Sequence, residues 1–162
     1  MTDFEALYGK YSRDVYRFAL YLCGDHAEAE DIAAETFARA WNANGAIRAA
    51  TAKAYLLTIA RNCYLEGLRR GKPQTQLDDA MADPAASPSR DAESRIELRR
   101  VLEELQRMPE VDRTVLLLHV QEGMPYQAIA GAVGLSLPAV KVKIHRARLK
   151  LALWRAAQET KR

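Results

Sequence analysis

The sequence predicts an all-α protein with two small helical domains that are joined by a flexible linker. Apolar residues recur at three- and four-residue steps in both halves, and no window alternates strictly over the length of a strand. Between residues 73 and 92, three prolines stand among Ser, Ala, Asp and Gln with almost no large apolar side chain. Such a composition cannot bury a core. We therefore expect domains at 1–72 and 93–162, joined by a linker at 73–92 that leaves their mutual orientation open.

Three helices are expected in the first domain. The first spans the apolar positions from Phe4 to Phe18 and ends at Gly24, after which Asp25 is a suitable N-cap for a helix over 26–41. The inner side of that second helix is expected to hold Ala29, Ile32, Ala33, Phe37, Ala40 and Trp41. A third helix over 51–70 is expected to bury Tyr55, Leu56, Ile59, Cys63 and Leu68. It would leave Arg61, Asn62, Arg69 and Arg70 in solvent.

The second domain begins with a helix whose apolar positions run from Leu98 to Leu105 and which stops before Pro109. The next helix is expected over 111–121, with Gly123 as its C-terminal stop. The rest of the domain has the pattern of a helix-turn-helix. Its first helix would place Ile129, Ala130 and Val133 inward, and Gly134 supplies the turn.

The second helix of this motif has a basic outer side. Ser136 can cap it, and Pro138 is tolerated in its first turn. The apolar positions that begin with Val140 and Ile144 would face inward. The outward and flanking positions hold Lys141, Val142, Lys143, His145, Arg146 and Arg148. Arg and Lys can reach guanine edges or phosphates in the major groove, and Val can meet a thymine methyl. The alternative is a plain helical hairpin with a solvated basic side.

Charge is separated along the chain although the net charge is only +3. Residues 141–162 carry 8 basic residues and one acid, 39–72 carry seven bases and one acid, and 25–35 carry five acids and no base. This separation indicates two different partners, one of them polyanionic. The acids at 25–35 either form a protein-docking face or, in the first turn, complement the helix dipole.

A second basic strip follows the third helix and the segment before it. Its members are Arg48, Lys53, Arg61, Asn62, Arg69, Arg70 and Lys72, beside Tyr55. An aromatic ring among cations suits single-stranded nucleic acid, because bases stack on the ring while the cations meet phosphate. A buried Tyr55 with ordinary surface arginines is the competing interpretation.

The sequence carries no signature of an enzyme or of a bound cofactor. His26, His119 and His145 fall in different expected helices, and no nucleotide-binding, zinc-protease or nucleophile-elbow motif is present. Cys23 and Cys63 lie in apolar patterns and are expected to be reduced thiols rather than a disulfide or zinc site. No apolar run approaches a membrane span, and the acidic N-terminus lacks a secretory signal. We expect a cytoplasmic protein without catalytic residues, metal, cofactor or membrane insertion.

These motifs resemble a known family. Residues 16–25, 29–41 and 55–62, followed by Arg69 and Arg70, are similar to region 2 of bacterial RNA polymerase sigma factors. Residues 123–148, with Ala130 and Gly134, are similar to region 4 of the same factors. Two such regions with only a short linker between them resemble the extracytoplasmic-function (ECF) class of the sigma-70 superfamily.

The resemblance implies a promoter-specificity subunit that binds core RNA polymerase, promoter DNA and an anti-sigma factor. Polymerase contacts on the β′ clamp helices would come from Asp31, Glu35, Arg39 and Trp41, and helices over 93–121 would pack on the β flap. The −10 element would meet Arg48, Lys53, Tyr55, Arg61, Asn62, Arg69 and Arg70. The −35 element would meet Lys141, Val142, Lys143, His145, Arg146 and Arg148. The alternatives are a sigma-like decoy or adaptor for an anti-sigma factor, and a stand-alone helix-turn-helix repressor.

Overall fold

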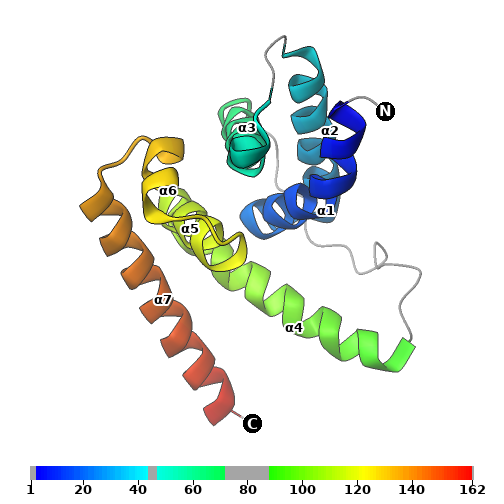
Figure 1. Cartoon of the computed structure of the whole chain (residues 1–162). Coiled ribbons are helices and arrows are strands. Elements are labelled where there is room, and N and C mark those ends of the chain that lie inside the picture. The colour runs from blue at the N-terminus through cyan, green and yellow to red at the C-terminus, as the bar shows by residue number, and fades with distance from the viewer. Residues whose placement is uncertain (1–2, 44–46, 72–87, 162) are drawn as a thin grey trace.

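The computed structural model describes residues 3–43, 47–71 and 88–161, and no β-strand occurs among them. The first half contains α1 (Asp3–Cys23), α2 (His26–Asn42), the 3₁₀ turn η1 (Ala49–Thr51) and α3 (Ala52–Arg69). The second half contains α4 (Pro88–Gln106), α5 (Glu110–Leu116), the π-helical segment η3 (Leu117–Gln121), α6 (Tyr126–Val133) and α7 (Leu137–Thr160), as Figure 1 shows. The predicted all-α class is confirmed.

The junction between α1 and α2 has the expected chemistry. Gly24 has φ +77°, a left-handed conformation that glycine adopts without a Cβ penalty. The side chain of Asp25 accepts a hydrogen bond from the backbone N–H of Glu28 at 3.1 Å and so caps α2. The two helices therefore fold back on each other, with Phe18, Ile32 and other apolar residues buried between them and α3.

The helix-turn-helix is formed by α6 and α7. Gly134 has φ +72° and ends α6, and the Ser136 side chain accepts from the backbone N–H of Ala139 at 3.2 Å and begins α7. The chain bends by 102° between the two helices, within the range typical of this motif. Ile129 of α6 and Ile144 of α7 are buried, which fixes the angle by packing.

Two helix boundaries differ from the sequence prediction. The helix expected over 111–121 is α-helical only to Leu116 and continues as the π-helical η3 to Gln121. Helix α4 begins at Pro88, inside the expected linker; proline is tolerated there because a first-turn N–H has no helical partner to lose. The rest of that linker and Lys72 lie outside the described residues.

Several side chains that were expected to be buried are exposed. Trp41, Tyr55 and Leu68 all stand in end turns of their helices, where neighbours cover one side only. The Trp41 ring packs edge-on against Phe4, with centroids 4.8 Å apart, and the remainder of the side chain faces solvent. Helical spacing identifies the face of a residue but not how far the neighbouring helix extends.

Ile59 and Cys63, also expected inside the first domain, are only half-buried. In contrast, Arg61 was expected in solvent, and its side chain is only 12% exposed. The expectation for Arg61 was wrong because α5, from the second half of the chain, covers this part of α3.

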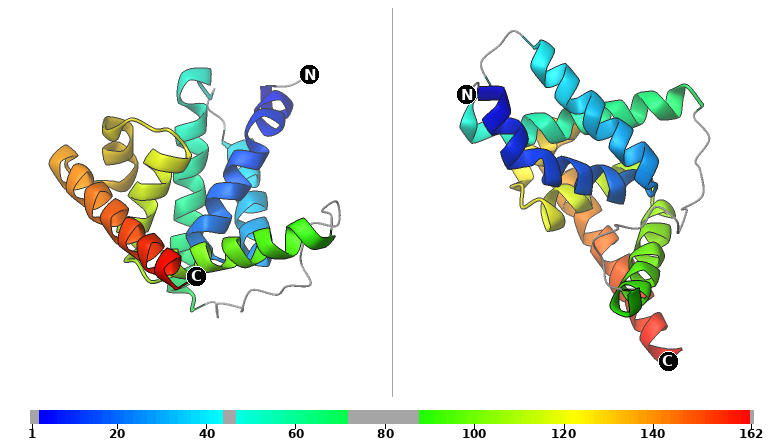
Figure 2. Two further views of the ribbon diagram at one scale, coloured as in Figure 1. Left: turned by 90° about the horizontal axis from the view of Figure 1, so that it is seen from below. Right: turned by 90° about the vertical axis from the view of Figure 1, so that its right-hand side faces the viewer.

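The two halves of the chain pack against each other. Helix α1 contacts α4, α5 and η3, while α3 contacts α6. Figure 2 shows α4 running across one end of the α1–α3 bundle. Buried apolar residues of both halves form one continuous cluster, from Phe18 and Leu22 to Leu105, Met108 and others beyond. The sequence left this mutual orientation open; in the structure it is defined.

Polar contacts also cross between the halves. Arg113 on α5 is buried, and its guanidinium donates to the Tyr64 hydroxyl of α3 at 2.8 Å and to the carbonyl oxygen of Met108 at 3.0 Å. The Gln106 side chain on α4 donates to the carbonyl oxygen of Leu22, at the end of α1, at 3.0 Å. These hydrogen bonds orient the apolar contact because each needs a defined geometry.

Within the described residues, no single helix is both long and apolar enough to cross a membrane. The α6–α7 pair meets the length and composition criteria only when the two helices are taken together across their bend.

Candidate DNA and polymerase interfaces

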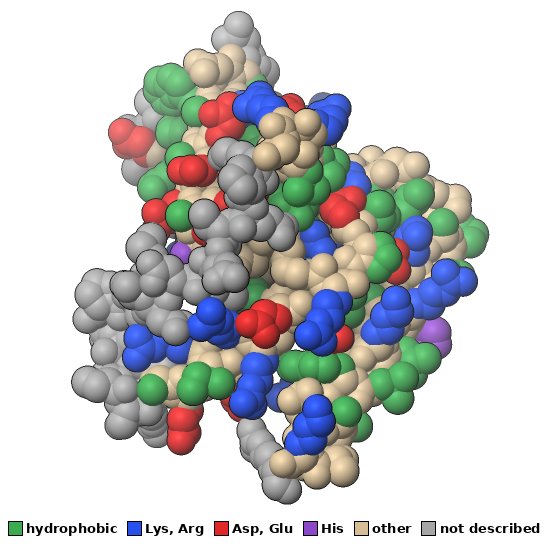
Figure 3. Space-filling model, turned by 180° about the vertical axis from the view of Figure 1, so that it is seen from behind, with side chains coloured by type: hydrophobic (Ala, Val, Ile, Leu, Met, Phe, Trp, Pro, Cys, Tyr) green, Lys and Arg blue, Asp and Glu red, His purple; other side chains and the backbone are tan. Residues whose placement is uncertain are grey.

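The outer side of α7 carries exposed basic side chains. Lys141, His145, Arg146 and Arg148 are exposed, and Val142 between them is 47% exposed. Val140 and Ile144 on the opposite side are buried against the rest of the second half. Lys and Arg side chains gather in Figure 3 over the part of the surface where α7 lies. Helix α7 thus offers hydrogen-bond donors and one apolar contact on a single convex surface.

Lys143 differs from these neighbours. Its ammonium group forms an ion pair with Asp112 of α5 at 3.2 Å, and both side chains are largely covered. In the structure Lys143 therefore fastens α7 to α5, and reaching DNA would require it to leave Asp112. The sequence showed the basic residue but not the acid that faces it from another helix.

The basic strip of α3 is divided into an exposed and a covered part. Asn62, Arg69 and Arg70 are exposed, as is Arg48 ahead of η1, and Tyr55 is 37% exposed. An aromatic side chain with this exposure can still offer a face to an unpaired base. The competing interpretation, a buried Tyr55, is wrong.

Arg61 and Lys53, the remaining members of this strip, are engaged by acids of the second half. The Arg61 guanidinium donates two hydrogen bonds to the Glu110 carboxylate, at 2.8 and 3.2 Å. Lys53 lies 3.3 Å from the Glu122 carboxylate and donates to the Glu122 backbone carbonyl oxygen at 3.0 Å. Burial opposes ionisation of Glu110, but hydrogen bonds from Arg61 and Thr114 outweigh it, so the pKa of Glu110 lies below its ordinary value.

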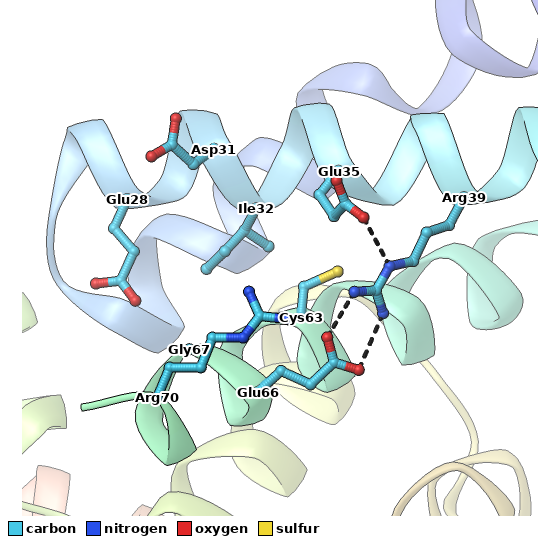
Figure 4. A pocket seen from close by; sticks show the side chains of 9 residues that line it. All are labelled: Glu28, Asp31, Ile32, Glu35, Arg39, Cys63, Glu66, Gly67 and Arg70. Atoms are coloured by element: carbon cyan, nitrogen blue, oxygen red, sulfur yellow. Dashed lines mark hydrogen bonds and ion pairs between the residues drawn. The ribbon is translucent and has the colours of Figure 1, made fainter. Parts of the chain in front are cut away.

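A pocket of about 260 Å³ lies between α2 and α3, and Arg70 of the basic strip is one of its lining residues. It is lined by Glu28, Asp31, Ile32, Glu35, Arg39, Cys63, Glu66, Gly67 and Arg70 (Figure 4). Asp31 and Glu35, two of the predicted polymerase contacts, are exposed at its edge, whereas Trp41 is exposed further along α2. The acids of this surface complement a basic partner.

Arg39 bridges the two helices of the pocket. Its guanidinium donates to Glu35 on α2 at 3.0 Å and to Glu66 on α3 at 2.5 and 3.2 Å, as Figure 4 shows. The hydrogen bonds that Arg39 donates lower the pKa of the accepting Glu66 carboxylate, and donating to Glu66 and Glu35 raises the pKa of Arg39 itself. Arg39 therefore holds α2 against α3 and fixes the position of Glu35.

The described residues contain no group of three His, Cys, Asp or Glu side chains that could hold a metal ion. His26 contacts the Tyr16 hydroxyl at 2.8 Å, and His119 lies at the core edge beside Tyr126, so the histidines are dispersed. Cys23 is buried and Cys63 half-buried, both as free thiols. Burial raises the pKa of Cys23 to about 12, which keeps this thiol protonated at neutral pH.

Each half of the chain matches the model of a known protein family. Residues 7–73 match the model for Sigma-70 region 2, and residues 98–151 match the model for Sigma-70 region 4. A probable RNA polymerase sigma factor, RfaY of Xanthomonas campestris, is 37% identical over 83% of this chain, which spans 36% of that protein's length. The ECF RNA polymerase sigma factor SigL of Mycobacterium tuberculosis is 29% identical, over 91% of this chain and 86% of that protein.

A solved structure has the same fold. The sigma factor RpoE of Bartonella quintana, crystallised in complex with the anti-sigma factor NepR, superposes with a TM-score of 0.70 at 23% identity, covering 93% of this chain and 95% of that one. The chain matches region 2 and then region 4, in that order. These matches and the curated relatives agree with the residue patterns described above. The chain belongs to the sigma-70 family of RNA polymerase sigma factors, in its ECF class.

Proposed function

We propose that this chain binds core RNA polymerase in the cytoplasm and directs it to promoters, without catalytic activity of its own. The observation that supports this most directly is the outer face of α7, where Lys141, Val142, His145 and Arg146 are exposed on a helix set at a fixed angle to α6. A helix displayed in this way fits the major groove. The −35 element is then read by donors to guanine and by Val142 at a thymine methyl.

The −10 element is the second DNA site in this proposal. Tyr55 would stack on an unpaired base, and the cations of α3 and the preceding segment would bind the phosphates around it. Asn62, Arg69, Arg70 and Arg48 are exposed and available for this role. Arg61 and Lys53 join them once their contacts with Glu110 and Glu122 open.

The polymerase would dock on α2. Asp31, Glu35 and Arg39 surround the pocket in Figure 4, and Trp41 extends the surface along the same helix. Acids on a rigid helix and an exposed aromatic ring together suit a basic, partly apolar helical partner. The helices over 93–121 would contact the β flap. An anti-sigma factor would be a further partner, since the similar RpoE was crystallised in complex with the anti-sigma factor NepR.

In vitro transcription with core polymerase and the promoter of the chain's own operon tests the proposal. We expect Lys141→Ala combined with Arg146→Ala to reduce promoter-directed transcripts at least about tenfold, because each base-edge contact contributes roughly 1–3 kcal/mol. Co-purification with core polymerase should be unchanged, since α2 carries that contact.

Arg155→Ala combined with Lys161→Ala is the matched control, because it removes the same charge from exposed positions at the end of α7. Unchanged transcription in the Lys141 and Arg146 variant would refute the −35 role of α7. Tight duplex binding without polymerase in a gel shift would favour the repressor alternative. Binding of an anti-sigma factor without any transcription would favour the decoy.

A further inference from the structure

We propose that Asp112 of α5 and Lys143 of α7 are a positioning pair, which sets the rotation of α7 for promoter reading, and that Lys143 is not itself a DNA ligand. The Lys143 ammonium lies 3.2 Å from the Asp112 carboxylate. This inference rests on the proposed function, because it concerns the helix that reads the −35 element. It gives Asp112, which stands on a different helix from the reading residues, a role in promoter specificity.

The two side chains of the pair are largely covered. That of Asp112 is 12% exposed and that of Lys143 is 30% exposed, whereas Lys141 and Arg146 on the same helix as Lys143 are exposed. Salt screens a covered ion pair much less than an exposed one. Removing either partner of such a pair leaves the other charge covered and uncompensated. A DNA phosphate would therefore have to draw Lys143 away from a carboxylate that needs it.

The pair restrains the rotation of α7 about its own axis. Val140 and Ile144 on the inner side of α7 are buried, but apolar contacts are not directional. Lys143 precedes Ile144 and so lies about 100° around the helix from it, on the flank of α7. An ion pair on the flank fixes the rotation that the apolar contacts leave free.

A small rotation is enough to disturb base reading. Side chains extend the surface of an α-helix to about 5–6 Å from its axis, so a rotation of about 20° moves that surface by roughly 2 Å. Hydrogen bonds to base edges need donor–acceptor distances within a few tenths of an ångström. The outward residues Lys141, His145 and Arg146 would therefore lose their register with the bases if α7 turned on α5.

Asp112 also has a competing role within its own helix. It lies in the first turn of α5, where an acid complements the helix dipole, and Glu110 lies in the same turn. Dipole complementarity requires neither burial of the acid nor a lysine from another helix. The 3.2 Å contact with Lys143 and the burial of Asp112 therefore favour the positioning role. The two roles differ in what they predict for promoter specificity.

The experiment uses holoenzyme reconstituted from core polymerase and the full chain. Its templates are the promoter of the chain's own operon and the same promoter with one −35 base pair exchanged, and the ratio of their transcripts measures discrimination. We expect Asp112→Asn and Lys143→Gln each to lower this ratio at least about threefold, because misplaced base contacts discriminate less. The double variant should be no worse than either single variant, since all three lose the same contact.

Lys143→Arg is the conservative variant at this position. Arginine keeps the positive charge and can donate to the Asp112 carboxylate, so discrimination should stay within about twofold of wild type. A loss as large as that of Lys143→Gln would contradict the pair. Circular dichroism checks that each variant is folded at the assay temperature, and Asp112→Asn preserves the shape of the side chain in case Lys143→Gln does not fold.

Salt dependence distinguishes a positioning lysine from a DNA ligand. Lys141→Gln removes the same charge from an exposed position two residues earlier on α7. It should reduce the slope of log affinity against log salt by about 0.9, the value for one phosphate contact, in filter binding of holoenzyme to the promoter duplex. Lys143→Gln should leave the slope unchanged, because Lys143 neutralises Asp112 rather than a phosphate.

Three results would overturn the positioning pair. Unchanged discrimination in Asp112→Asn would mean that this acid serves only the dipole of α5. Additive losses in the double variant would mean that Asp112 and Lys143 act separately. A slope that falls in Lys143→Gln as it does in Lys141→Gln would make Lys143 a DNA ligand. Failure of the proposed function looks different, since wild-type holoenzyme would then produce no promoter-directed transcripts.

Discussion

Identical residue types in this chain have different roles because different groups face them. Lys141 is exposed, whereas Lys143, two residues along the same helix, is paired with Asp112. Arg69 is exposed at the end of α3, whereas Arg61 is held by Glu110 two turns earlier. At the residue scale, sequence identifies the cation, and the facing acid decides whether that cation is available to DNA.

Gly134 is the residue on which the helix-turn-helix angle depends. Its φ of +72° is costly for any residue with a Cβ, although nothing lies within 4 Å of an added Cβ there. We expect Gly134→Ala to lower the free energy of unfolding by about 1 kcal/mol, measured by urea denaturation. The cost is purely conformational.

Gly131 is a matched control only three residues away. It lies inside α6 without a positive φ, and an added Cβ again meets nothing within 4 Å. We expect Gly131→Ala to raise the free energy of unfolding by about 0.5–1 kcal/mol, because alanine loses less backbone entropy in a helix. Equal effects of the two substitutions would contradict the role given to the turn.

At the scale of elements, α2 serves two purposes on two sides. Its inner side buries Ala29, Ile32 and Phe37 in the core. Its outer side carries Asp31 and Glu35 at the edge of the pocket. Dipole complementarity accounts for acids in the first turn of a helix but not for Glu35, which lies more than two turns into α2. This favours the docking interpretation of the acidic cluster.

Reversing these two charges tests the docking surface. We expect Asp31→Lys combined with Glu35→Lys to weaken binding to core polymerase at least about tenfold in a quantitative pull-down, because like charges would then face each other. Stability should change little, since the Glu35–Arg39 pair is exposed and such pairs contribute about 0.5 kcal/mol or less.

Glu159→Lys serves as control for the type of substitution, because it reverses the charge of one exposed acid on α7, away from the docking surface. If the variant with both charges reversed binds core polymerase as tightly as the wild type does, the assignment of α2 to the polymerase interface is wrong.

At the scale of the whole molecule, the two halves form one body through buried apolar residues and a few charged contacts. The charged contacts make the stability of the folded protein depend on pH. Burial opposes ionisation of Glu110, but Arg61, Thr114 and Arg113 favour the charged carboxylate, so its pKa is lowered by folding. A depressed carboxyl pKa stabilises the folded form above the unfolded pKa and loses this contribution as pH falls through the folded pKa.

We therefore expect the contribution of Glu110 to the stability of the folded protein to be complete above about pH 4.5, the ordinary pKa of Glu, and to be lost as the pH falls further. Urea denaturation at a series of pH values checks this. The difference in unfolding free energy between wild type and Glu110→Gln should shrink on acidification. A difference that stays constant or grows would contradict the assignment of this pH dependence to Glu110.

Local sequence was sufficient for most of the fold. The all-α class, the Asp25 and Ser136 caps and the stops at Gly24 and Gly134 all depend on residues that are close together in the chain. Periodicity also placed the acids of α2 and the outer residues of α7 on the correct faces. Each of these features follows from backbone and side-chain preferences that act over a few residues.

What needed the tertiary structure was everything that depends on residues far apart in the chain. Arg61 and Glu110 are 49 positions apart, and Arg17 and Glu122 are 105 apart. No short-range pattern predicts that such residues will meet, nor that Tyr55 and Trp41 lie beyond the cover of neighbouring helices. Packing of the second half on the first decides which cations stay open, because the energy of a charge depends on what surrounds it in space rather than on what precedes it in the chain.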